Sequence, residues 1–166
     1  MAYAVTHVLI AIILIDLFRK YVLKKKEFPL YLVLLGGIAG LLPDIDIIIF
    51  WILQTATDIS LSAVHHPYTH NLIIPIIILL FAIITRKNSK LSHPAFVISA
   101  GYTIHIILDT IFSQIPIFYP LSNKILGLNL GLIFSLSGTF FIGLDAILLV
   151  SWLIYQWKTR NMRDYI

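Results

Sequence analysis

Long runs of apolar residues, separated by short polar stretches, dominate the pattern along the chain. A hydrocarbon core about 30 Å thick is crossed by roughly 20 mostly apolar helical residues, and five runs approach or exceed that length. They are residues 2–18, 28–53, 67–85, 94–114 and 129–157. The third run is the least regular, because Pro75 interrupts its dense apolar part. The pattern predicts an all-α, polytopic membrane helical bundle with about five transmembrane helices.

The composition supports this class and excludes others. Of the 166 residues, 59% are hydrophobic and 12% are charged, and the mean hydropathy of +0.93 is above that of soluble domains of this size. No internal repeat or linker divides the chain, so we expect residues 1–166 to form a single integral membrane domain. Without cysteine, the chain has neither a disulfide nor a thiolate ligand. We expect no cleaved signal peptide, because the first basic residue, Arg19, follows the first apolar run.

Basic residues lie between the apolar runs and predict the orientation in the membrane. The formal net charge of +4 does not indicate a nucleic-acid partner, because these residues do not form a polar folded face. Five helices bring eleven of the twelve to one side, in three clusters: Arg19, Lys20, Lys24, Lys25 and Lys26; Arg86, Lys87 and Lys90; Lys158, Arg160 and Arg163. The positive-inside rule makes that side cytoplasmic. We therefore expect a multi-pass protein of the plasma or inner membrane, with the N-terminus outside and the C-terminus in the cytoplasm.

Ionisable side chains in the apolar runs mark a candidate site. Each costs on the order of 3 kcal/mol near the bilayer centre and therefore requires a partner or a function. Their depth below the outer ends of the runs, at 1.5 Å per residue, extends from roughly 8 Å for His7 to roughly 14 Å for Asp44. The residues are His7, Asp44, Asp46, His65, His66, His70, His105 and Asp109. Lys and Arg alone set the topology, yet all eight fall in the outer half, which predicts a single site facing the extracytoplasmic side.

Imidazole and carboxylate groups in such number are typical ligands of zinc or another divalent cation. His105 and Asp109 are four residues apart, so both project from one face of a helix. Pro43 predicts a break in the segment LLPDID, which is tolerated at this depth where the backbone lines protein or a wet cavity. Just upstream, Gly36 and Gly40 predict the close approach of a neighbouring helix. The sequence therefore predicts one or more bound metal ions.

Four short motifs carry these residues: THVLI at 6–10, LLPDIDIII at 41–49, HHPYTHNL at 65–72 and GYTIHIILD at 101–109, with FYPLS at 118–122 as a weaker fifth. In order and character they resemble the YdjM-like family of membrane-bound, metal-dependent hydrolases, over about two-thirds of the chain. The resemblance implies six functional positions, with Asp46 in the same motif, and we expect these six to be the metal ligands: His7, Asp44, His65, His70, His105 and Asp109. The order of these residues also looks like that of the zinc-dependent phospholipases C and zinc nucleases, although their later ligands have no evident match here.

The third motif departs from the family pattern, which usually reads His-Arg-Gly-x-Thr-His-Ser. His66, Pro67 and Asn71 stand at the Arg, Gly and Ser positions. Loss of the Arg weakens the expectation of phosphate or anion recognition, and His66 is the candidate to replace it. Asp46 is interpreted either as a catalytic base or as a carboxylate that orients a histidine. On a straight helix, Asp44 and Asp46 would point to nearly opposite faces.

Other polar residues receive structural interpretations. We expect Asp16 to pair with Arg19 or Lys20 at helical spacing. Asp145, about 22 Å below the outer end of its run, is expected to make a buried polar contact. His93 is predicted to be cytoplasmic and not a ligand.

Three classes of function remain open. The leading hypothesis is a hydrolase in which bound metal polarises an ester or phosphoester oxygen and activates water, with a lipid or lipid-linked substrate drawn from the bilayer. A metal-ion or proton transporter is the second, and a non-catalytic scaffold that needs metal to fold is the third. A membrane zinc protease is excluded, because the sole glutamate, Glu27, is not part of a His-Glu-x-x-His motif.

Overall fold

The computed structural model describes residues 4–22, 28–65, 68–135 and 137–158. Within these ranges the regular elements are helices, accompanied by one isolated bridge between Ile115 and Leu126, which confirms the all-α prediction. The helices are α1 (Ala4–Tyr21), α2 (Leu30–Ala39), α3 (Ile45–Leu53), α4 (Leu61–Val64), α5 (Ile73–Ile84), α6 (Ser89–Phe112), α7 (Leu130–Ile133) and α8 (Gly138–Lys158).

Two of the described helices, α6 and α8, are long and apolar enough to cross a membrane. Helix α1 has 18 residues but contains Asp16, Arg19 and Lys20. Helices α2, α3 and α5 have 10, 9 and 12 residues, and even the longest of these extends only about 18 Å. That is less than the thickness of about 30 Å of the hydrocarbon core. The arrangement of five spans and its orientation therefore stay predictions.

The second apolar run forms two helices, which confirms the predicted break. Helix α2 ends at Ala39 and α3 begins at Ile45, with Pro43 between them. Pro43 has no N–H, and the Asp44 N–H donates to the Leu41 carbonyl at 3.1 Å. In a continuous helix, the Gly40 carbonyl would accept from the N–H of residue 43 or residue 44. It accepts from neither here, so it is left for another donor.

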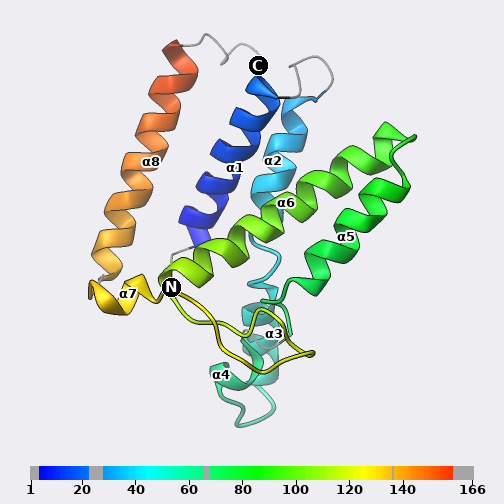
Figure 1. Cartoon of the computed structure of the whole chain (residues 1–166). Coiled ribbons are helices and arrows are strands. Elements are labelled where there is room, and N and C mark those ends of the chain that lie inside the picture. The colour runs from blue at the N-terminus through cyan, green and yellow to red at the C-terminus, as the bar shows by residue number, and fades with distance from the viewer. Residues whose placement is uncertain (1–3, 23–27, 66–67, 136, 159–166) are drawn as a thin grey trace.

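Helix α6 runs diagonally across the bundle, between α5 on one side and α1 and α2 on the other (Figure 1). It approaches α2 closely at Gly101, where an added Cβ would lie within 3.0 Å of the Gly36 carbonyl carbon. The predicted close approach at Gly36 is thus confirmed, and its partner is α6. Around this crossing, buried apolar side chains of α1, α2 and α6 form the main core with Phe28: Ile12, Ile15, Leu32, Val33 and Val97.

Helix α8 joins the bundle through polar contacts with α1. Thr6 Oγ1 donates to Asp145 Oδ1 at 2.6 Å, so the expected polar contact is present, but it is partly and not fully buried. Gln156 Nε2 donates to Asp16 Oδ2 at 2.6 Å, and the predicted pair of Asp16 with Arg19 is present at 3.1 Å. The estimated depth of Asp145 was wrong, because α8 begins at Gly138 and not near residue 129. Asp145 therefore lies roughly 10 Å from the start of its helix.

The two ends of the bundle differ in character. The C-terminal ends of α1 and α8 and the turn between α5 and α6 lie toward one end (Figure 1). This end, called the basic end below, carries the described residues Arg19, Lys20, Arg86, Lys87, Lys90 and Lys158. Helices α3 and α4 and the segment 113–128 lie toward the opposite end.

Candidate metal centre

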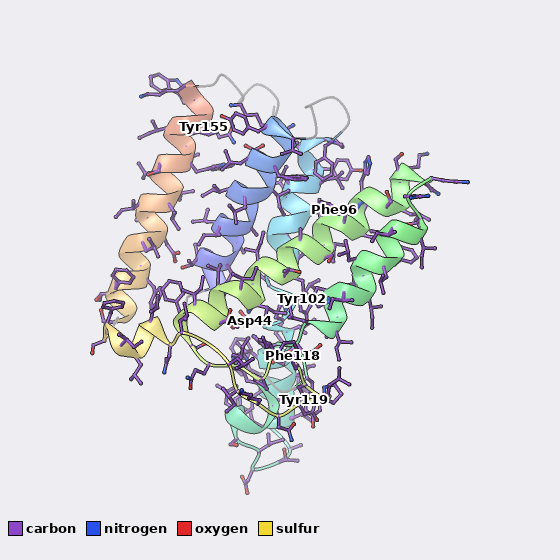
Figure 2. The ribbon with its side chains drawn as sticks, in the orientation of Figure 1. Asp44, Phe96, Tyr102, Phe118, Tyr119 and Tyr155 are labelled. Carbon is purple, nitrogen blue, oxygen red and sulfur yellow. The ribbon has the colours of Figure 1, made fainter. Side chains whose placement is uncertain are left out.

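The predicted site residues converge where α6 crosses the break between α2 and α3, at the position of Asp44 in Figure 2. One comes from α1, two from the break and the start of α3, two from the segment between α4 and α5, and two from α6: His7, Asp44, Asp46, His65, His70, His105 and Asp109. His66, the remaining candidate, lies outside the described residues. The seven are buried except Asp44, whose side chain is 19% exposed.

Four potential ligand atoms form the centre of this cluster. His70 Nε2 lies 3.2 Å from His105 Nε2, 3.4 Å from Asp44 Oδ1 and 3.3 Å from Asp109 Oδ2. His105 Nε2 lies 3.6 Å from Asp44 Oδ1 and 3.4 Å from Asp109 Oδ2. Bonds of about 2.0–2.2 Å from zinc to nitrogen or oxygen place the corners of a regular tetrahedron about 3.3–3.6 Å apart. The five separations are therefore those of a four-coordinate cation site.

Hydrogen bonds on the outer sides of the two central rings assign their tautomers. His105 Nδ1 lies 2.6 Å from the Gly40 carbonyl, which only accepts, so this nitrogen carries the proton. Thr69 Oγ1 donates its one proton to Asp46 Oδ2 at 2.6 Å and therefore accepts from His70 Nδ1 at 3.0 Å. In neutral rings, both Nε2 atoms then present lone pairs to each other at 3.2 Å. Such a pair repels unless a proton or a metal ion lies between the nitrogens.

The carboxylates of the centre also present lone pairs that no hydrogen-bond donor in the described part of the chain satisfies. Both oxygens of Asp109 and Oδ1 of Asp44 are buried atoms that accept no hydrogen bond among the described residues. Removing an ionised carboxylate from water costs several kcal/mol when nothing compensates it. A divalent cation compensates both groups at once. Two imidazoles and two carboxylates, without thiolate, suit zinc or a similar borderline cation, so the residues fit the group that the sequence predicted.

His7 and His65 extend the cluster on either side. His7 Nε2 lies 3.4 Å from Asp109 Oδ1, and the His7 ring stacks on His105 with 3.9 Å between ring centres. His65 Nδ1 lies 2.8 Å from Asp46 Oδ1. In each of two groups the ligand atoms lie within 4.8 Å of one another: His7, His105 and Asp109; Asp44, His65 and His70. The contact between His70 and Asp109 makes these groups adjoin.

Asp46 contacts the outer nitrogens of the histidines. Its Oδ1 faces His65 Nδ1, and its Oδ2 accepts from Thr69 and lies 3.5 Å from His70 Nδ1. Asp44 reaches the other nitrogen of His70, so the two carboxylates approach this ring from opposite sides. Of the two interpretations of Asp46, this geometry favours a carboxylate that orients histidine rings.

Sequence reasoning missed three supporting contacts, made by Gly40, Asn71 and Tyr102. Gly40 supplies the carbonyl that fixes His105, and no sequence signal identifies which carbonyl does so. Asn71 Oδ1 accepts from the backbone N–H groups of Ile73 and Ile74, at 3.0 and 3.3 Å, and so caps the start of α5. An Asn just before an apolar helical run is a recognised start signal. The Tyr102 hydroxyl donates to the Thr69 carbonyl and holds the same segment against α6.

Comparison with known families gives one match. The model of a family described as YdjM inner membrane protein matches residues 1–164. The matched range includes every candidate ligand and also α8, which the four sequence motifs do not reach. No curated protein and no solved structure matches the chain.

Proposed function

The chain belongs to the YdjM inner membrane protein family, and from this premise we propose that it is a membrane-embedded, metal-dependent hydrolase. The bond cleaved is a phosphoester or ester in a lipid or lipid-linked substrate. The observation that carries the proposal is the pair of facing Nε2 atoms of His70 and His105, with carboxylate oxygens of Asp44 and Asp109 at tetrahedral separations.

A bound divalent cation supplies Lewis acidity, which polarises the scissile group and makes water a nucleophile near neutral pH. The proposed holders are the four central residues together with His7 and His65, which flank them. With six candidate ligands in two adjoining groups, the donor set is large enough for two cations, an arrangement that suits phosphoester cleavage. Zinc is the preferred identity, since all six ligands are imidazoles or carboxylates.

The chain's own residues position the ligands and control access. The Gly40 carbonyl fixes the His105 ring, and Asp46 fixes the His65 ring and, through Thr69, the His70 ring. Among the four central residues, Asp44 alone is partly exposed, at 19%. We therefore place the approach of substrate and water on the Asp44 side. His66 stays a candidate for contact with an anionic group, on sequence grounds.

A lipid or lipid-linked substrate is supported by the surroundings of the site. The candidate metal centre, marked by Asp44 in Figure 2, lies away from the basic end, which the positive-inside rule assigns to the cytoplasm. Helix α3, which begins beside Asp44, exposes a row of large apolar side chains: Ile45, Ile48, Ile49, Trp51, Ile52 and Leu53. An apolar surface of this kind beside the Asp44 opening favours a substrate that reaches the site from the bilayer.

A transporter requires polar groups that continue from the site toward the other face. The acids that lie on this course in the described part of the chain already have partners. Asp145 accepts from Thr6, and Asp16 is bonded to Arg19 and Gln156. These contacts support a pocket closed at one end, and therefore a hydrolase.

Metal analysis of the full chain purified in detergent tests the proposal. We expect at least one stoichiometric divalent cation in the wild type, and its loss in His105→Ala and Asp44→Ala. His93→Ala is the matched control, because His93 lies on the same helix as His105, is half-buried and stands outside the cluster. Stoichiometric metal retained in both site variants would refute the proposed centre.

Activity separates a hydrolase from a metal-stabilised scaffold. We expect release of the headgroup from a phosphoester lipid in mixed micelles, lost on chelation and in His105→Ala, and restored to the wild type by added zinc. A scaffold would keep its metal in a closed coordination shell and show no turnover on phosphoester or ester lipids.

A further inference from the structure

An elongated apolar groove lies at the basic end of the bundle, along the N-terminal part of α6. A cavity of about 490 Å³ opens there, lined by Phe18, Phe28, Ala82, Ile83, Arg86, Ser92, His93 and Phe96. A second cavity of about 190 Å³ shares the three phenylalanines and continues to Ala100 and Ile104. Figure 2 labels Phe96 on this part of α6. The two cavities adjoin along these shared phenylalanines, and together they are called the basic-end groove below.

The length of the basic-end groove matches one lipid acyl chain. On α6 the lining extends from Ser92 to Ile104, which is about 18 Å of helix. An acyl chain occupies one leaflet, half of a hydrocarbon core about 30 Å thick, and so extends about 15 Å. The lining residues of α6 recur at steps of three and four, which places them on one face of the helix.

The mouth of the basic-end groove is positively charged. Arg86 is the sole permanently charged residue among the described lining residues, and it forms no ion pair within the described part of the chain. No carboxylate lines the groove in that part. His93 stands beside the mouth, with its ring centre 5.7 Å from that of Phe28. An apolar groove beside a guanidinium that has no ion pair among the described residues is complementary to a molecule with an apolar tail and an anionic head.

We propose that the basic-end groove binds an anionic phospholipid, with one acyl chain along the phenylalanines and the phosphate beside Arg86. Basic pockets between membrane helices on the cytoplasmic side bind anionic headgroups in this way. The bound chain fills the space between α1 and α6, so the lipid acts as a structural ligand. This site shares no residue with the metal centre, and its test is independent of hydrolysis.

Native mass spectrometry of the detergent-purified full chain tests this lipid site. Phosphatidylglycerol and phosphatidylcholine with identical acyl chains are titrated separately. We expect one phosphatidylglycerol to bind about five-fold more tightly, because one basic residue near the membrane surface contributes about 1 kcal/mol. Arg86→Gln is expected to abolish this preference. Lys87→Gln is the matched control, since Lys87 lies next in the same turn and does not line the groove.

Two further measurements separate the groove from a general surface charge. Ile83→Trp fills the apolar part and is expected to weaken the binding of both lipids at least five-fold, with the melting temperature in lipid-free detergent and the metal content unchanged. Glycerol phosphate, the head without a chain, is expected not to compete. Equal binding of the two lipids by the wild type, equal losses in Arg86→Gln and Lys87→Gln, or full competition by glycerol phosphate would each overturn the proposal.

Discussion

The clearest single test of the metal centre is Asp46→Asn, which changes the support of the ligands but removes none of the four central atoms. In the structure, Asp46 Oδ1 faces His65 Nδ1 at 2.8 Å and Oδ2 accepts from Thr69 at 2.6 Å. An asparagine has one acceptor oxygen, and its NH₂ group would confront the other donor. Either His65 or the pair of Thr69 and His70 therefore loses the bond that orients its ring.

The expected loss follows from the number of bonds affected. One hydrogen bond to a charged group contributes about 1.5–3 kcal/mol, which corresponds to a factor of about 10–100 in an equilibrium constant. Loss of a residue that orients a metal ligand costs a similar factor in metal affinity. We therefore expect the dissociation constant for zinc to rise about 10–100-fold in Asp46→Asn, and further in Asp44→Ala, which deletes a ligand.

Competition against a chromogenic zinc chelator in detergent micelles measures these dissociation constants. Asp58→Asn is the matched control, because Asp58 lies in the same part of the chain and is exposed. Its affinity is expected to equal that of the wild type. An affinity within two-fold of the wild type for Asp46→Asn, beside a large loss for Asp44→Ala, would show that Asp46 does not orient the histidine ligands.

Three other outcomes are expected. Gly101→Ala places a methyl group against the Gly36 backbone and should destabilise the protein by about 1–3 kcal/mol. Gly143→Ala lies inside α8 and meets nothing within 4 Å, so it should not lower the melting temperature. Pro43→Ala restores an N–H that competes for the Gly40 carbonyl, and should weaken zinc binding about 10-fold in the same chelator assay. In free zinc at 100 times its dissociation constant, the bound metal contributes about 2.7 kcal/mol of stability. Chelation should therefore lower the melting temperature by roughly 5–10 °C, with no fall in His105→Ala.

Sequence reasoning predicted those features of the site that depend on residue type and local spacing. The helix break follows from Pro43, the shared face of His105 and Asp109 from their four-residue spacing, and the pair of Asp16 and Arg19 from helical geometry. Each of these is a property of a few consecutive residues, which the chain reports directly.

Features that depend on the meeting of distant segments were not predictable. The register of α6 against α2 decides that His105 meets the Gly40 carbonyl, and the fold of the segment before α5 decides that Thr69 links His70 to Asp46. The start of α8 was misplaced because residues 129–137 are apolar but include a short separate helix, α7. Composition alone does not separate a spanning helix from such a turn.

The partner of His105 is a main-chain oxygen, and this has a consequence for how the site tolerates change. A peptide carbonyl is present whichever amino acid occupies the position, so no replacement at residue 40 can delete the acceptor itself. The bond to His105 depends instead on the backbone conformation of residues 40–44. A bulkier side chain or an added N–H in this segment is expected to move the carbonyl oxygen. In a mutational scan, substitutions at Gly40 and Pro43 should therefore impair the site, because they disturb the acceptor of His105. Neither position carries a side-chain functional group of its own.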